Sequence, residues 1–356
     1  MRIENDVKLD FEDVLIRPKR STLTSRAEVS LERSFTFLHS HRTWTGIPIV
    51  AANMDSSGTF EMAEALAQHK MLTVLHKFYN VKELAIFLPK FNKPDYVSYC
   101  VGIRDEDFAK LKEVMNKGLH KHFNFICLDV PNAYLESVVK KLRELRKLLP
   151  SHTIIAGNVV TNEMTEELLL SGADIVKVGI GPGSMCLTRR KTGVGYPQLS
   201  ATIECADAAH GIGSNGGCGL IMSDGGARYP ADVAKAFCGG ADFLMSGSLF
   251  SGNDQSGGKL ITKDGKKFKE CYGSSSDVAM KRHYGKVEKH RTSEGRYSLI
   301  PYKGNVNDFI LDLLGSLRST ATYIGARRLK EFSKRATFIM VGRQLNTSLE
   351  QYDARE

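Results

Sequence analysis

Short apolar runs alternate with longer amphipathic stretches through most of this chain. The runs are rich in β-branched residues and have the length of strands, whereas the stretches between them carry apolar residues three or four positions apart. The runs are residues 46–53, 71–76, 96–103, 123–130, 152–160, 174–181, 219–226 and 242–248. Eight strands that alternate with helices predict a (β/α)8 TIM barrel, an α/β fold with a parallel sheet.

The loop after the sixth run stands out by its length and composition. Successive runs begin 22 to 29 residues apart, except that 45 residues separate the starts at Asp174 and Gly219. In this fold the loops at the carboxyl ends of the strands form the active site. The long loop contains GIGPGSMCLTRRKTGVGYPQLSA, with Cys186 next to several glycines. Glycine allows close approach to a ligand, and a cysteine in such a loop is a candidate nucleophile.

The chain after the eighth run lacks strong periodicity. Residues from about 253 to 304 are polar, lysine-rich and punctuated by glycine, and we interpret them as a mobile flap over the mouth of the barrel. Residues 305–332 are expected to form the closing helix. We therefore predict one barrel domain over residues 1–342, including the flap, and a flexible tail over residues 343–356.

Composition and charge argue against several classes of partner. The net charge is +9, but the basic residues are scattered and lack interleaved aromatics, so nucleic acid is not the expected partner. No apolar run approaches the roughly 18 residues of a membrane span, and the first ten residues contain no apolar signal core. We expect a cytoplasmic protein without a membrane partner. Seven cysteines without a CxxC pair indicate free thiols.

Glycines after the seventh and eighth runs are candidates for phosphate binding. These loops read SDGGARYP and SGS, and in TIM barrels they often surround a phosphate with backbone N–H groups. Gly225, Gly226, Gly247 and Ser248 are the candidates, and Asp224 is placed to accept hydrogen bonds from a ribose. Each glycine pair taken alone is also an ordinary turn. The GIGPGS stretch does not match the dinucleotide fingerprint, because Pro182 interrupts the turn and a serine replaces the last glycine.

Four segments together resemble the IMP dehydrogenase/GMP reductase family. They are the cysteine loop, AANMDSSGTFEMA (residues 51–63), DFEDVLIRPKRST (residues 10–22) and SDGG. The resemblance extends from about Asn5 to Val341, and the N-terminal stretch with GVGYPQLSA favours the reductase branch. It implies an oxidoreductase that converts GMP and NADPH to IMP, ammonia and NADP+ in purine nucleotide salvage. It also implies a cytoplasmic homotetramer.

The resemblance implies that three residues carry the chemistry. Cys186 would attack C2 of the purine and form a covalent thioimidate, which splits one difficult substitution into two easier steps. Thr188 and Glu294 would move the proton of the departing ammonia, since a hydroxyl needs a carboxylate partner to act near neutrality. Glu294 lies on the predicted flap, far along the chain from Cys186. Folding and closure of the flap must therefore bring these residues together.

Further positions match the ligand contacts of the family. The implied GMP contacts are Asp224, Gly225, Gly226, Gly247, Ser248, Gly273, Ser275, Arg291, Ser293 and Gly295. The implied NADPH contacts are Ser25, Arg26, Lys77, Asp129, Asn132, Ser319 and Thr322, of which the first two are expected to come from a neighbouring subunit. Gly181, Gly183 and Cys186 match a loop whose backbone carbonyls bind a monovalent cation, K+.

Some residues depart from the family pattern, and other functions stay open. Pro131, Ala133, Leu187, Ser274 and the loop 213–218 differ from what the family leads us to expect, and we expect them to change kinetics rather than chemistry. One alternative is an IMP dehydrogenase without its regulatory insert, because only 18 residues separate Lys77 from Tyr96. The pair Arg296 and Tyr297 is reminiscent of that enzyme, although we interpret it as coincidence. A GMP-binding regulator without activity and a flavin-dependent barrel enzyme are the others.

Overall fold

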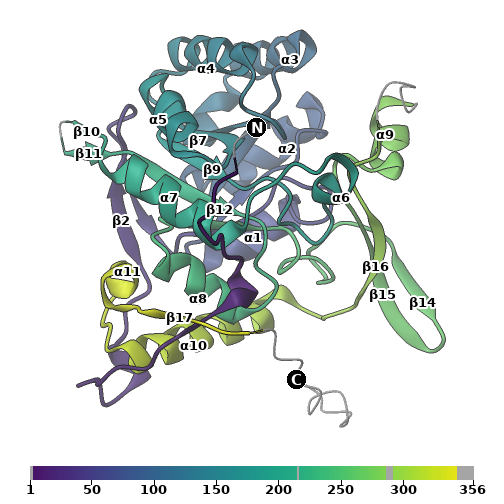
Figure 1. Ribbon diagram of the computed structural model, residues 1–356. Coiled ribbons are helices and arrows are strands. Elements are labelled where there is room, and N and C mark those ends of the chain that lie inside the picture. The colour runs from purple at the N-terminus through teal and green to yellow at the C-terminus, as the bar shows by residue number, and fades with distance from the viewer. Residues whose placement is uncertain (1–2, 215, 286–291, 343–356) are drawn as a thin grey trace.

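The computed structural model describes residues 3–214, 216–285 and 292–342, and it confirms the predicted (β/α)8 barrel (Figure 1). Each of the eight predicted runs contains one parallel strand of a closed barrel, in which β13 pairs with β4. The barrel strands are β4 (Ile49–Ala51), β5 (Leu72–Val74), β6 (Val97–Val101), β7 (Phe125–Asp129), β8 (Thr153–Val159), β9 (Ile175–Val178), β12 (Leu220–Asp224) and β13 (Phe243–Ser246).

The helices follow the amphipathic stretches and surround the barrel. They are α1 (Phe60–Gln68), α2 (Val81–Phe91), α3 (Asp105–Asn116), α4 (Glu136–Leu148), α5 (Asn162–Leu170), α7 (Gln198–His210), α8 (Pro230–Cys238) and α10 (Val306–Ile324). Local signals set their ends. The Thr59 hydroxyl caps α1 by accepting from the Met62 N–H, and Asn80 with Glu83 forms a capping box on α2. In the described part of the chain, no helix is both long and apolar enough to cross a bilayer.

The closing helix is shorter than predicted. We expected it over residues 305–332, but α10 ends at Ile324, because Gly325 adopts the left-handed conformation that terminates helices. The chain continues through η5 (Leu329–Glu331) and α11 (Phe332–Arg335) to β17 (Phe338–Met340). β17 pairs antiparallel with β1 (Val14–Ile16), so the two ends of the described chain lie together. The other short helices are η1 (Phe11–Asp13), η2 (Arg26–Glu28), η3 (Pro94–Tyr96), η4 (Leu119–His122) and α6 (Thr188–Thr192).

A hairpin near the N-terminus closes the amino end of the barrel, and the sequence analysis did not predict it. β2 (Arg33–Thr36) and β3 (Thr43–Gly46) pair antiparallel. Phe35, Phe37 and Trp44 of this hairpin are buried against residues inside the barrel, including Phe125 and Phe243. The barrel is therefore a packed core that is covered at this end and open at the other.

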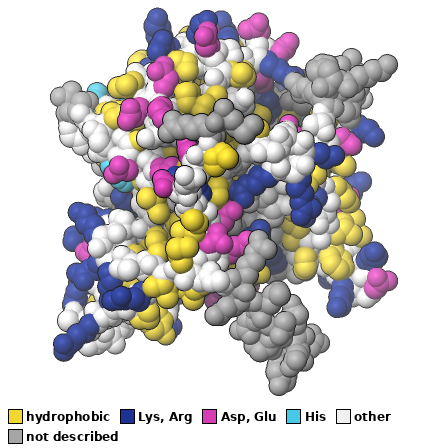
Figure 2. Space-filling model, viewed as in Figure 1, with side chains coloured by type: hydrophobic (Ala, Val, Ile, Leu, Met, Phe, Trp, Pro, Cys, Tyr) yellow, Lys and Arg dark blue, Asp and Glu magenta, His cyan; other side chains and the backbone are white. Residues whose placement is uncertain are grey.

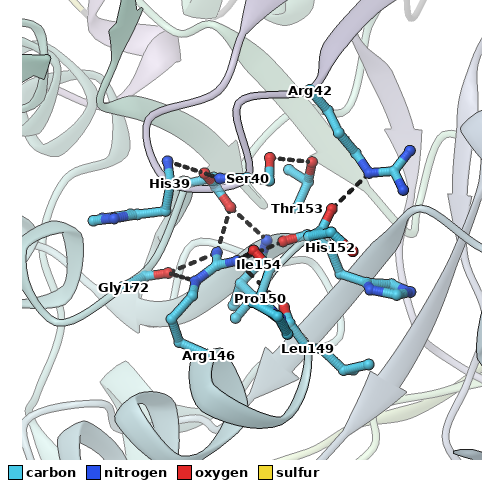
Figure 3. Close-up of polar contacts among 12 residues, drawn as sticks. His39, Ser40, Arg42, Arg146, Leu149, Pro150, His152, Thr153, Ile154 and Gly172 are labelled. Atoms are coloured by element: carbon cyan, nitrogen blue, oxygen red, sulfur yellow. Dashed lines mark hydrogen bonds and ion pairs between the residues drawn. The ribbon is translucent and has the colours of Figure 1, made fainter. Parts of the chain in front are cut away.

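Asp174 and Asp242 anchor the hairpin to the amino ends of β9 and β13. Both follow a Gly-Ala pair and are almost completely buried. Asp174 accepts hydrogen bonds from the N–H groups of His39, Ser40 and Ile154, at 2.7, 3.1 and 2.8 Å. It also accepts from the Arg146 guanidinium at 2.6 Å, within a network of hydrogen bonds around the hairpin turn (Figure 3). Asp242 accepts in the same manner from Arg33, His210 and the Ile221 N–H.

Replacing Asp174 with alanine is expected to lower the free energy of unfolding by about 3–5 kcal/mol, the usual cost of breaking a buried ion pair. The change removes the carboxylate that pairs with the Arg146 guanidinium, which keeps only backbone carbonyls as acceptors, and it leaves three N–H groups without their acceptor. Urea unfolding followed by circular dichroism measures the loss. Glu136→Gln is the matched control, because it removes an exposed pair with Lys140 and should change nothing measurable. Equal effects of the two variants would contradict this prediction.

His210 is expected to make stability depend on pH. Its hydrogen bond with Asp242 raises the pKa of the imidazole above its ordinary value of 6.5. A group whose pKa is raised by folding stabilises the protein fully below the unfolded pKa, and that stabilisation is lost as the pH rises through the folded pKa. The His210→Asn variant should therefore lose more stability, relative to the natural protein, at pH 5.5 than at pH 9 in thermal unfolding. A deficit that grows with pH would refute the assignment.

The predicted flap contains regular structure. β14 (Leu260–Lys263), β15 (Lys266–Tyr272) and β16 (Tyr297–Pro301) form an antiparallel sheet, and α9 (Asp277–Tyr284) follows β15. This sheet and helix project to one side of the barrel in Figure 1. The movement of the flap stays a prediction. Residues 286–291 of the flap and the predicted tail 343–356 lie outside the described residues.

Two further sequence observations can be located on the structure. The loop 213–218, which departs from the family pattern, is a small hairpin of β10 (Gly213–Ser214) and β11 (Gly217–Cys218) before the amino end of β12, remote from the strand ends that face the mouth. Lysine and arginine side chains occur at several separate places on the face shown in Figure 2, among acidic and apolar ones. This agrees with their scattered distribution in the sequence.

Candidate active site

A cavity lies at the open, carboxyl end of the barrel, where the strand ends meet the cysteine loop and the flap. Most of the predicted site residues line it. They are Cys186, Thr188, Glu294, Asp129, Gly181, Gly183, Asp224, Gly225, Gly226, Gly247, Ser248, Gly273, Ser275 and Gly295. Ser293 is adjacent, and its hydroxyl donates to the Gly295 carbonyl at 3.2 Å. Arg291 lies outside the described residues.

Three of these side chains form a continuous chain of hydrogen bonds. The Cys186 thiol donates to the Thr188 hydroxyl at 3.1 Å, and this hydroxyl donates to Glu294 Oε2 at 2.6 Å. All three residues are partly exposed to the cavity. A nucleophile, a hydroxyl and a carboxylate in this order provide a path along which a proton leaves the sulfur and reaches the carboxylate.

The backbone of the flap holds Glu294 against the cysteine loop. The Leu187 N–H donates to the Glu294 carbonyl at 2.6 Å, and the Arg296 N–H donates to the Met185 carbonyl at 2.8 Å. Cys186 and Gly295 are opposite each other in this antiparallel bridge. A Cβ atom at Gly295 would lie 2.5 Å from the Ser276 nitrogen, so glycine is needed for this close approach. Cys186 and Glu294, which are 108 positions apart in the sequence, are thus brought together by an antiparallel backbone pairing.

The glycine loops after β12 and β13 form another part of the cavity wall. Gly225 and Gly226 have φ angles of +89° and +84°, a conformation that favours glycine and turns the backbone toward the ligand space. The Ser248 hydroxyl donates to the Ala227 carbonyl at 3.0 Å and ties the two loops together. At the end of β12, Asp224 accepts from the Asn158 amide at 2.8 Å.

Lys177, on β9, is a residue of the cavity that the sequence analysis missed. Its side chain is 2% exposed, and its Nζ lies 2.5 Å from Asp129 Oδ1 and 3.2 Å from Asp224 Oδ2. Burial lowers the pKa of the Lys177 ammonium, but the two carboxylates raise it by more, so the pKa lies well above its ordinary value. A single basic residue inside an otherwise apolar run was the signal that could have revealed it.

The predicted cofactor residues fall into two groups. Asp129 lines the cavity, and Lys77 and Asn132 follow β5 and β7, which lie on either side of β6 in the barrel. Ser25, Arg26, Ser319 and Thr322 do not line the cavity. Ser25 caps η2, which contains Arg26, and Ser319 and Thr322 lie on α10. η2 and α10 pack against each other at the lower left of Figure 1, whereas α6 of the cysteine loop lies at the upper right. The chain therefore does not bring the two groups together.

The predicted cation loop surrounds the nucleophile. The Cys186 N–H donates to the Gly183 carbonyl at 2.9 Å, and Gly181 has a φ of +82° beside the Arg189 side chain. Within residues 3–214, 216–285 and 292–342, no cluster of His, Cys, Asp and Glu side chains is suited to a metal ion. A cation bound here would take backbone carbonyl oxygens as ligands, and its presence stays a prediction.

Comparison with known proteins decides the family. The sequence model described as IMP dehydrogenase / GMP reductase domain matches residues 8–348, nearly the whole chain. The chain belongs to the IMP dehydrogenase/GMP reductase family. This confirms the resemblance drawn from the cysteine loop and the N-terminal motifs.

Similar members of the IMP dehydrogenase/GMP reductase family share more than half of their residues with this chain. GMP reductase of Caenorhabditis elegans is 57% identical over 347 residues, which cover 97% of this chain and 95% of that protein. GMP reductase of Salmonella arizonae is 56% identical over 348 residues, or 97% and 98% of the two chains. GMP reductase of Ascaris suum is 55% identical over 359 residues, or 100% and 98%.

The dehydrogenase-like pair Arg296 and Tyr297 lies outside the cavity of this family member. Tyr297 is on β16, 45% exposed, and its hydroxyl donates to Glu270 of the adjacent strand at 3.0 Å. The Arg296 backbone pairs with the cysteine loop, but its side chain does not line the cavity. This arrangement supports the interpretation of the pair as coincidence.

Proposed function

We propose that this protein is an oxidoreductase that converts GMP and NADPH to IMP, ammonia and NADP+ through a covalent intermediate on Cys186. The observation that carries the proposal is the hydrogen-bonded chain from Cys186 through Thr188 to Glu294 at the mouth of the barrel. The names of relatives more than 50% identical over nearly their whole length support the same reaction. Overall, GMP, NADPH and one proton give IMP, ammonia and NADP+.

The first step removes ammonia. The Cys186 proton passes to Thr188 as the Thr188 proton passes to Glu294, along contacts of 3.1 and 2.6 Å. The thiolate then forms a C–S bond with C2 of the purine. The reverse transfer through Thr188 returns a proton to the amino group, the C2–N bond breaks, and ammonia leaves. A thioimidate between C2 and Cys186 remains.

The second step releases IMP. NADPH, when bound, supplies the hydride that C2 accepts as the C–S bond breaks and the sulfur leaves as a thiolate. Within one chain, Asp129 at the cavity and the neighbouring Lys77 and Asn132 would hold the reacting end of the cofactor. Ser25, Arg26, Ser319 and Thr322 would hold the other end from a neighbouring subunit. Their position away from the cavity supports a homo-oligomer, which we propose to be a tetramer.

GMP would lie across the cavity between the glycine loops and the cysteine. Backbone N–H groups at Gly226, Gly247 and Ser248 would bind its phosphate beside Gly225, whose own N–H donates to the Met245 carbonyl at 3.2 Å, and Asp224 would accept from its ribose. Gly273, Ser275, Arg291, Ser293 and Gly295 would contact the nucleotide from the flap. The carbonyls of Gly181, Gly183 and Cys186 would hold K+, which would steady the cysteine loop. The cellular role that follows from the reaction is purine nucleotide salvage in the cytoplasm.

Two parallel assays test the proposed reaction. NADPH absorbance is followed with GMP, with ammonia quantified in the same samples, and NADH formation is followed with IMP and NAD+. Loss of NADPH with an equal amount of ammonia is the expected result. NADH formation from IMP would instead indicate a dehydrogenase, and GMP binding without turnover in either assay would indicate a regulator. A yellow purified protein would indicate a flavin enzyme.

A further inference from the structure

The buried ammonium of Lys177 joins two carboxylates that belong to different parts of the cavity. Asp129 is the last residue of β7, and Asp224 is the last residue of β12. Their side chains are 31% and 19% exposed, whereas that of Lys177 is 2% exposed. Lys177 itself is therefore almost inaccessible to a ligand. The two carboxylates present their remaining surface to the cavity.

The barrel provides a specific place for this lysine. Gly157 of β8 is the neighbour of Lys177 in the sheet, and a Cβ atom at Gly157 would lie 2.5 Å from the Lys177 Cβ. The missing side chain leaves the lysine room across the barrel. The Asn158 amide donates to both Asp224 Oδ2 and the Gly179 carbonyl, each at 2.8 Å, and so fixes the second carboxylate.

We propose that Lys177 is a positioning residue that couples the GMP side of the site to the NADPH side through one shared positive charge. The inference rests on the proposed function, because it takes Asp224 as the contact to GMP and Asp129 as the contact to NADPH. Asp129 and Asp224 each have a carboxylate oxygen within 3.2 Å of the same Lys177 nitrogen. Two ionised carboxylates at such positions repel each other, and the ammonium between them offsets the repulsion. Each carboxylate then remains an acceptor for the hydroxyl groups of its ligand.

Removal of the ammonium changes both halves of the site at once. Without Lys177, the two carboxylates can no longer both be ionised in their present positions at low cost. One of them gains a proton or turns away, and the ligand that it contacts loses an acceptor. A residue that acts only on one ligand, or only on stability, does not have this double effect.

The first experiment compares Lys177→Met with Lys235→Met. Lys235 on α8 is also a buried lysine, and it donates to the Phe11 carbonyl at 2.9 Å outside the cavity. We expect Lys177→Met to raise KM for GMP and for NADPH by at least about tenfold each, equivalent to about 1.4 kcal/mol. Lys235→Met should leave both KM values unchanged. Calorimetric titration with GMP alone should show the same weakening for Lys177→Met.

The second experiment separates charge repulsion from a structural role. In the double variant Lys177→Met/Asp129→Asn, no second carboxylate repels Asp224, so GMP affinity in calorimetry should recover most of the loss. Losses that add, without recovery, would overturn the proposal. Should Lys177→Met alone fail to fold by circular dichroism, the double variant and the charge-retaining Lys177→Arg provide the same comparison. In that case Lys177→Arg should bind GMP more tightly than the triple variant Lys177→Met/Asp129→Asn/Asp224→Asn.

The outcomes distinguish this inference from the proposed reaction. Natural protein that binds no GMP and oxidises no NADPH would refute the reaction itself. Natural protein that turns over normally, together with unchanged KM values for Lys177→Met, would refute the coupling alone.

Discussion

Replacement of Cys186 with alanine is expected to lower kcat for NADPH oxidation by at least about 10⁴-fold, the scale seen when an enzyme loses its nucleophile. The sulfur forms and breaks the only covalent bond between protein and purine in the proposed reaction. GMP binding should persist, because Asp224 and the glycine loops are at the ends of β12 and β13, whereas the cysteine loop follows β9. The measurements are NADPH absorbance with GMP and calorimetric titration of GMP into the variant.

Cys218→Ala is the matched control for this prediction. Cys218 is a partly exposed free thiol on β11, near the amino end of the barrel and outside the cavity. Its removal should leave turnover unchanged. Mass spectrometry of the acid-quenched natural enzyme should reveal a purine nucleotide on Cys186 that Cys186→Ala lacks. Substantial turnover by Cys186→Ala would remove the covalent mechanism.

Glu294→Gln is expected to slow the complete reaction by about 10²- to 10³-fold, within the range for loss of a general acid–base. The amide cannot take up the proton that Thr188 passes at 2.6 Å. Hydride transfer needs no such proton acceptor, so it should be affected much less. Rapid mixing of the variant with IMP and NADP+ in alkaline buffer tests this separation, because the buffer base can then take the Cys186 proton in place of Glu294, and the reverse hydride step forms NADPH without any need for ammonia.

Glu270→Gln provides the comparison on the same flap. Glu270 lies on β15 and accepts from the Tyr297 hydroxyl at 3.0 Å, away from the cavity. Its variant should keep both steps near the natural rates. If Glu294→Gln slowed the NADPH burst as much as the full reaction, its assigned role in ammonia loss would be untenable.

The sequence predicted the barrel well because its strands are buried on both faces. Such strands are continuous apolar runs with clear ends, and all eight were identified. The hairpin at residues 33–46 and the flap sheet escaped prediction for the opposite reason. Residues 266–272 read KKFKECY, in which four charged residues, one of them the buried Lys269, hide the pattern of a strand. This strand, β15, is stabilised by pairing with β14 and β16, which the local sequence does not reveal.

The site was predicted unevenly, and the difference has a physical cause. The glycine loops and Cys186 follow predicted strand ends, so the barrel topology itself brings them to one cavity. The proximity of Glu294 to Thr188 came from the family resemblance, since no local pattern links residues so far apart. Lys177 was missed because a lysine in a strand usually extends to solvent, and its inward position depends on Gly157, Asp129 and Asp224 together.

The pairing between the flap and the cysteine loop also bears on when the chemistry can start. Glu294 is carried by the flap, so any opening that separates Gly295 from Cys186 also removes its carboxylate from Thr188. In the proposed reaction, the loss of ammonia needs this carboxylate. The reacting groups would therefore be complete only when the flap covers the cavity, which ties the start of the reaction to the exclusion of bulk water.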